Sequence, residues 1–137
     1  MPVVFSSPFV QFHHDPESAT FETEWLDFAN SEQLRSSLTE ALNLARRLRV
    51  RGWIGNNTRL RTIRPVDQEW LGQVWFAEFA RLGVRRLAVV IPQDALAQMG
   101  LQNILQLADE HTPYDTQYFD DVASARRWVA EAPLVPV

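Results

Sequence analysis

The chain has 137 residues, of which 46% are hydrophobic and 22% are charged, and its net charge at pH 7 is −4. This length is typical of one domain, and the hydrophobic fraction excludes a disordered protein. There is no cysteine, which excludes disulfides, zinc–thiolate sites and cysteine nucleophiles. The acidic balance argues against nucleic-acid binding, and no stretch resembles a membrane span or a signal peptide. We therefore expect one cytoplasmic domain over residues 1–137, frayed at 133–137.

The first expected elements are two strands between residues 9 and 28, separated by a turn at residues 15–18. Aspartate and proline in the turn favour a tight reversal, and a connection this short makes the two strands antiparallel. Glu22 and Glu24 lie two residues apart in the second strand, so this strand is expected to have one solvent-facing side.

The first helix is expected to begin at Asn30 or Ser31. Asn30 is a good N-cap residue, and Gln33 three residues later can complete a capping box. Leucines and alanines then recur every three or four positions up to residue 48, which predicts one apolar stripe. Gly52 either ends this helix or opens the next strand.

Strands and helices alternate from this point onward. Strands are expected at residues 53–57, 87–91 and 115–119. Helices are expected at 65–82, at 94–108 with a weak point at Gly100, and after an N-cap at Asp120. Such alternation requires parallel strands joined by crossovers. The predicted fold is therefore α/β, a mixed, mostly parallel sheet with an antiparallel N-terminal hairpin and about four helices.

The sequence has no recognisable catalytic motif. It lacks a nucleophile elbow, a P-loop and a dinucleotide-binding glycine pattern. His13 and His14 are adjacent in a strand and point to opposite faces, so they cannot hold one metal ion together. His111 lies in a polar loop, and Asp120 and Asp121 fit a helix cap better than a metal site. We expect no enzymatic activity, no metal and no cofactor.

The loop between the strand at 53–57 and the following helix is a candidate ligand site. It lies at the carboxyl end of a parallel strand, where open α/β sheets bind ligands. It leads into a helix N-terminus, which favours an anion. All 13 basic residues are arginines, and the alternative is that those in the loop are ordinary solvated charges. The side chains expected to hold a small anionic ligand or a lipid headgroup are Asn56, Asn57, Arg59, Arg61 and Arg64.

The helix expected at 65–82 carries more apolar surface than one core-facing stripe needs. Trp70 and Phe76 lie outside that stripe, so the N-terminal hairpin, other packing within the chain, a ligand or a second protein must cover them. Aromatic side chains dominate the energetics of interfaces. Trp70 and Phe76, together with Asp67, are therefore the candidate residues for association with a protein partner or with a second copy.

Three segments carry a family resemblance, within a likeness that extends from about residue 25 to residue 129. They are residues 53–76 (WIGNNTRLRTIRPVDQEWLGQVWF), 87–99 (LAVVIPQDALAQM) and 117–129 (QYFDDVASARRWV). The most specific elements are Pro65, Asp67 to Trp70, Trp75 with Phe76, Tyr118 to Asp120, Ala125 and Trp128. These segments resemble the small bacterial STAS-like family, which is related to anti-sigma-factor antagonists and shares features with the CRAL-TRIO lipid-binding fold.

This resemblance implies a mixed sheet with helices and a regulatory role without catalysis. Phospho-switch members of the wider group carry an Asp-Ser-Ser-Gly-like turn at a helix start, where a phosphate alters partner docking. Here the matching positions run from Arg64 to Asp67 and contain no serine. The resemblance therefore implies a non-catalytic module that acts through protein association, including self-association, without that switch. The alternative is binding of a small anion or a lipid headgroup at the loop.

Overall fold

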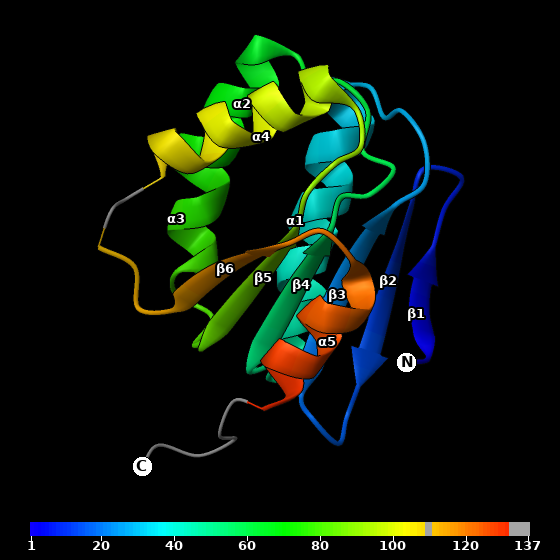
Figure 1. Ribbon diagram of the computed structural model, residues 1–137, viewed down its shortest axis with the longest axis vertical. Coiled ribbons are helices and arrows are strands. Elements are labelled where there is room, and N and C mark those ends of the chain that lie inside the picture. The colour runs from blue at the N-terminus through cyan, green and yellow to red at the C-terminus, as the bar shows by residue number, and fades with distance from the viewer. Residues whose placement is uncertain (109–110, 132–137) are drawn as a thin grey trace.

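The computed structural model describes residues 1–108 and 111–131 (Figure 1). Its strands form one six-stranded sheet in the order β1-β2-β3-β4-β5-β6. The strands are β1 (Val3–Ser6), β2 (Val10–Asp15), β3 (Thr20–Trp25), β4 (Gly52–Asn56), β5 (Arg86–Val90) and β6 (Asp115–Phe119). β1, β2 and β3 pair antiparallel, and β3 to β6 pair parallel. The predicted α/β fold with a mixed sheet and an antiparallel N-terminal hairpin is confirmed.

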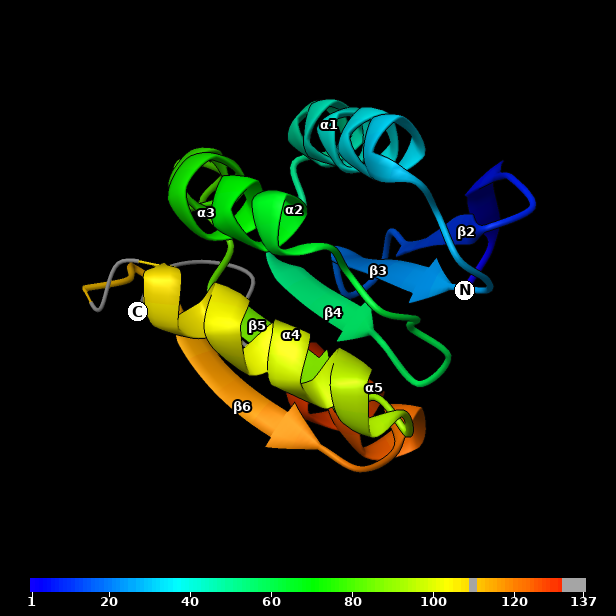
Figure 2. The ribbon, with the colours of Figure 1, turned by 90° about the horizontal axis from the view of Figure 1, so that it is seen from above.

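The helices cover both faces of this sheet unequally. They are α1 (Ser31–Leu48), α2 (Pro65–Trp70), the π-helical η1 (Leu71–Trp75), α3 (Phe76–Phe79), α4 (Ala95–Leu107) and α5 (Val122–Ala130). The helices that connect the parallel strands lie on one face, and α5 lies on the other (Figures 1 and 2). None of the helices within the described residues is both long and apolar enough to cross a bilayer.

The main core lies between the sheet and the connecting helices, and aromatic rings run through it. Phe12 packs on Phe21 with ring centroids 5.5 Å apart, and Phe21 packs on Trp53 at 4.7 Å. Trp53 in turn contacts Phe79 edge-on at 5.2 Å. Trp75 anchors the central helix to α1, because its indole N–H donates to the carbonyl of residue 38 at 2.9 Å. These contacts join the hairpin, the parallel strands and the helices in one core.

The ends of α1 follow the sequence prediction closely. The Asn30 side chain accepts a hydrogen bond from the Gln33 backbone, and the Gln33 side chain accepts one from the Asn30 backbone, at 2.8 and 3.0 Å. At the other end Arg49 takes the left-handed conformation with φ 54°. Gly52 opens β4 and does not end α1. A Cβ at this position would lie 2.3 Å from a side-chain methyl of Val129, so the glycine lets α5 approach the sheet.

Several predicted boundaries need correction. β1 precedes the predicted hairpin and adds a third antiparallel strand. The helix expected at 65–82 ends at Phe79 and contains the π segment. α4 runs unbroken through Gly100, where a Cβ would meet the Gln68 amide at 3.1 Å. The N-cap of α5 is Asp121, not Asp120. The tail at 133–137 lies outside the described residues.

The solvent-facing side expected for β3 is the largest discrepancy. Glu24 is half-buried, but Glu22 is fully buried, with 0% of its surface exposed. The helix α5 covers this part of the sheet face (Figure 1), and Arg126 on that helix pairs with the carboxylate. Glu22 and Glu24 therefore share one face of the sheet, but this face is not open to solvent because α5 covers part of it.

Candidate functional site

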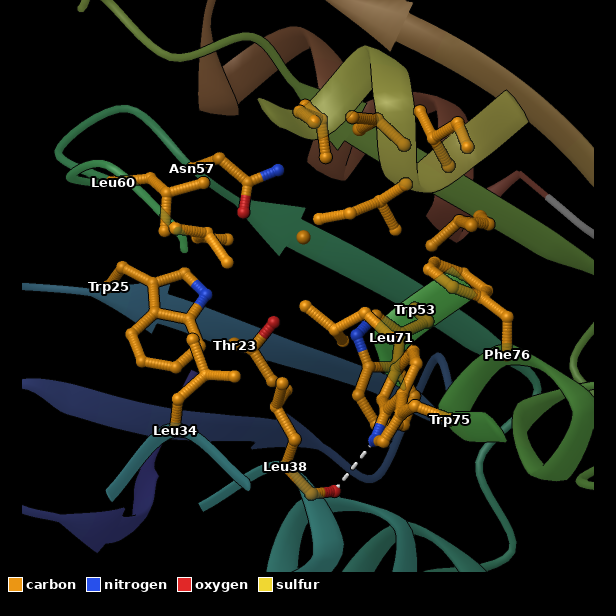
Figure 3. Close-up of a pocket in the computed structure, with 17 residues that line it drawn as sticks. Thr23, Trp25, Leu34, Leu38, Trp53, Asn57, Leu60, Leu71, Trp75 and Phe76 are labelled. Atoms are coloured by element: carbon orange, nitrogen blue, oxygen red, sulfur yellow. Dashed lines mark hydrogen bonds between the residues drawn. The ribbon is translucent and has the colours of Figure 1, made fainter. Parts of the chain in front are cut away.

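A pocket of about 80 Å³ lies between the sheet and the connecting helices, close to the carboxyl ends of the parallel strands (Figure 3). Ligands of open α/β folds bind at this carboxyl end of the sheet. Its wall is mostly apolar. The apolar lining comes from Trp25, Leu34, Leu38, Trp53, Leu60, Ile63, Leu71, Trp75, Phe76, Leu87, Val89, Leu101, Ile104 and Leu105.

Two local features of the backbone make room for this pocket. Gly55 forms part of the lining, and a Cβ built there would meet no atom closer than 3.5 Å. The absence of a side chain thus contributes open volume. The π-helical turn of η1 takes more residues than an α-helical turn. As a result Leu71, Trp75 and the adjoining Phe76 all face the pocket.

Four polar groups interrupt the apolar wall. They belong to Thr23, Trp25, Trp53 and Asn57, residues that are 4%, 5%, 2% and 7% exposed. None of them makes a side-chain hydrogen bond to another residue of the described chain. The amide of Asn57, the hydroxyl of Thr23 and the indole nitrogen of Trp25 point toward the middle of the pocket (Figure 3). The pocket therefore offers several hydrogen-bond donors to whatever occupies it.

These groups border open space and are not sealed inside packed protein. Over residues 1–108 and 111–131, the one occluded side-chain nitrogen or oxygen without a partner is Nε of Arg85. That atom lies outside the pocket lining. The unpaired groups in the pocket are therefore within reach of a small molecule that enters it.

The structure separates the five residues proposed for the loop site. Asn57 lines the pocket. Asn56 points to the opposite face of the sheet, where its amide donates to Glu22 at 3.3 Å. The side chains of Arg59, Arg61 and Arg64 are exposed and lie outside the pocket lining.

Arg59 and Arg61 instead border a shallow depression beside Asp27. The carboxylate of Asp27 lies 3.9 Å from the guanidinium of Arg61. Arg64 is the residue before α2 and makes no side-chain cap bond.

The residues proposed for association are largely covered by the chain itself. Asp67 is 3% exposed and accepts hydrogen bonds from Ser31 at 2.5 Å and from Arg35 at 3.0 Å. The Arg35 guanidinium also lies over the Trp70 ring, 5.3 Å from its centroid. Phe76 is half-buried, packs edge-on against Trp75 and borders the pocket. The additional aromatic surface of this helix, at Trp70 and Phe76, is therefore used for intramolecular packing and for the pocket.

A second polar cluster lies on the opposite sheet face and was missed by sequence reasoning. Arg126 donates to both carboxylate oxygens of Glu22, at 2.8 and 3.0 Å, and His13 lies 2.9 Å from a carboxylate oxygen of Glu24. The hydrogen bonding of Arg126 to Glu22 raises the pKa of the arginine. Ligand atoms of His13, Glu22 and Glu24 lie within 4.8 Å of one another. Arg126 already supplies the positive charge that Glu22 needs, which favours a structural ion pair over a metal site.

Comparison of the chain with protein-family models gives no match, and neither do comparisons with curated proteins and with solved structures. The STAS-like resemblance of residues 25–129 therefore stays a prediction from the sequence.

Proposed function

We propose that this chain is a binding module for a small, mostly apolar molecule that carries a hydrogen-bond acceptor. The observation that supports this most directly is Asn57, a residue that is 7% exposed and whose amide points into the pocket (Figure 3) and has no partner in the described chain. A ligand that covered this amide without offering it a hydrogen bond would lose about 1–3 kcal/mol, so the site favours a ligand with a polar group. Buried groups of this kind are normally satisfied by a ligand or by ordered water.

The lining also favours binding over acid–base catalysis. None of the residues that line the pocket in the described part of the chain is His, Asp, Glu, Lys or Arg. General acid–base chemistry needs such a group within hydrogen-bond reach of the substrate. The non-catalytic role implied by the STAS-like resemblance agrees with this composition.

The size and donors of the pocket narrow the ligand class. A volume of about 80 Å³ is roughly half that of an engineered cavity known to hold benzene. Ligands with few heavy atoms, such as short-chain carboxylic acids, ketones and esters, match this space. Their oxygen would accept from Asn57, Trp25 or Thr23, and their carbon chain would contact the leucines. The three exposed arginines of the 56–64 loop favour the anionic members of the class by long-range attraction.

The direct test is a thermal-shift and NMR titration with short-chain carboxylates and ketones. We expect stabilisation of the wild type, reaching roughly 2.7 kcal/mol at a hundred times the dissociation constant. Gly55→Val should abolish the shift by filling the pocket, while the matched control Gly55→Ala should weaken it less. Asn57→Leu should reduce affinity most for ligands with an acceptor oxygen.

Two results would overturn this proposal. One is the absence of binding across the whole series, with ordered waters satisfying all four polar groups in an experimental structure. The other is a ligand whose binding survives Gly55→Val and is lost in Arg59→Ala or Arg61→Ala. The second result would place binding at the arginines of the loop, which is the anion site predicted from the sequence.

A further inference from the structure

The two edges of the sheet differ in their protection against pairing with another strand. β1 is four residues long, and its register shifts between Val3 and Phe5. Short edge strands and bulges of this kind discourage intermolecular pairing. β6 keeps a regular register with β5 over five residues and contains no lysine, arginine or proline. Tyr118 on this strand is 53% exposed.

The backbone of β6 has hydrogen-bonding groups that face away from the sheet. Asp115 N–H donates to the carbonyl of residue 85, and the carbonyl of Phe119 accepts from residue 91, both at 2.9 Å. Because pairing alternates along a parallel strand, Gln117 also faces β5. Thr116 and Tyr118 therefore present their N–H and C=O groups at the edge of the sheet, where no strand of the described chain pairs with them.

This edge is complementary to itself in antiparallel pairing. With a two-fold axis at Gln117, Thr116 lies opposite Tyr118 of the second copy, and these outward-facing residues form the hydrogen-bonded pairs. Gln117 then lies opposite Gln117 of the second copy, and Asp115 lies opposite Phe119. No two like charges meet, which favours the arrangement.

The surface between β6 and α4 is uncharged. A groove of about 470 Å³ separates β6 from α4, and its lining is Ile91, Pro92, Gln98, Leu101, Gln102, Leu105, Gln106 and Tyr118. All 13 residues of α4 lack a charge, although 22% of the chain is charged. A second copy can therefore approach β6 without removing charged groups from water on this side, and depletion of charge is typical of interface cores.

We propose that two copies of this chain associate through β6 and form one sheet that continues across both molecules. The self-complementary register favours a second copy over an unrelated peptide strand. This interface is separate from the ligand pocket, because none of the β6 residues lines that pocket. It also differs from the surface around Trp70 and Phe76.

The test uses opposite charges at the two-fold position. Gln117 is exposed, so Gln117→Lys and Gln117→Glu should leave the monomer folded, while each places like charges opposite each other in the dimer. By sedimentation equilibrium up to sub-millimolar concentration, we expect the wild type to dimerise and each variant to be monomeric. An equimolar mixture of the two variants should dimerise again. Gln73→Lys, at an exposed position on η1, is the matched control and should dimerise like the wild type.

A monomeric wild type over this whole range would overturn the proposal. So would a dimer that both Gln117 variants leave unchanged, because such a dimer uses another surface. The dimer proposal and the pocket proposal can be contradicted separately. Ligand-induced stabilisation is expected to be the same in both Gln117 variants as in the wild type, whatever their oligomeric state.

Discussion

Arg126 on α5 donates two hydrogen bonds, of 2.8 and 3.0 Å, to the carboxylate of Glu22 on β3. The carboxylate has no exposed surface, whereas the arginine side chain is 44% exposed. Asn56 on β4 gives the same carboxylate a third hydrogen bond at 3.3 Å. One buried charge therefore connects the C-terminal helix to two strands.

Removing Arg126 is expected to destabilise the protein. In Arg126→Met, Glu22 loses its counterion while still buried, a change that typically costs about 3–5 kcal/mol. We expect about 2–3 kcal/mol, because the exposed arginine position admits water that partly solvates the carboxylate. Chemical denaturation at neutral pH measures this loss.

The matched control is Arg127→Met on the same helix. Arg127 is exposed and contacts Ser124 on the surface, so its loss should change stability by no more than about 0.5 kcal/mol. The deficit of Arg126→Met should also be largely absent in a Glu22→Gln background, because no buried charge is then left without its counterion. A deficit of the same size in that background would contradict the role given to Glu22.

Replacing Asn57 should stabilise the ligand-free protein. Asn57→Leu substitutes an apolar group of similar size for an amide that borders the pocket and has no side-chain partner in the described chain. We expect a gain of about 1–2 kcal/mol, because leucine buries more apolar surface against the apolar lining. Thermal unfolding without ligand checks the gain, and Asn43→Leu at an exposed position of α1 is the control, where the higher helix propensity of leucine alone should give no more than about 0.5 kcal/mol. A loss of stability would indicate that the amide is already satisfied.

Gly72 is expected to tolerate no side chain. A Cβ at this position would lie 2.4 Å from Cβ of Leu107 and 2.9 Å from the carbonyl oxygen of residue 104. In Gly72→Ala, η1 and α4 must therefore move apart, at a cost of about 1–3 kcal/mol. Gly55→Ala is the comparison, since its new methyl would meet nothing closer than 3.5 Å. Equal denaturation midpoints for these variants would show that the η1–α4 contact is loose.

The N-cap of α5 predicts a pH dependence at the acid end. Asp121 accepts hydrogen bonds from the backbone N–H of Ser124 at 2.7 Å and from its hydroxyl at 2.9 Å. These bonds lower the pKa of Asp121 from its ordinary value of 3.8. A carboxylate with a lowered pKa in the folded state contributes stability above its unfolded pKa and loses it as the pH falls through the folded pKa.

The matching variant is Asp121→Asn, which keeps an amide oxygen as the cap and cannot ionise. The stability advantage of the wild type over this variant should be constant near neutral pH. It should decrease as the pH falls below 3.8. Urea denaturation of both proteins between neutral pH and pH 3 or below measures the difference, which would contradict this account if it grew with acidification.

Sequence reasoning succeeded where local chemistry decides the structure. The capping box of Asn30 and Gln33 and the apolar stripe of α1 depend on nearby residues only, and both are present. The alternation of strands and helices was enough to predict the parallel part of the sheet. The π turn at Leu71–Trp75 was not predicted, because a helical pattern with 3.6 residues per turn treats Phe76 as lying outside the core stripe.

The site was harder to predict because it depends on distant contacts. The loop drew attention to Asn56 and Asn57 together, yet adjacent strand-end residues point to opposite faces, and only Asn57 lines the pocket. The pairing of Glu22 with Arg126 spans 104 positions in the chain. One signal was available in the sequence: Arg126 lies four positions after Val122 and three before Val129, which places it beside the apolar stripe of its helix.

The distance between these partners has a consequence for synthesis on the ribosome. Glu22 emerges early, but its counterion is translated 104 residues later. Until then the carboxylate remains hydrated, and Ile54, Ala88 and Val90 on the same sheet face lack the cover that α5 provides. A nascent chain that ends before α5 therefore exposes an apolar sheet face beside a charge, and it should depend on chaperones more than the released protein does.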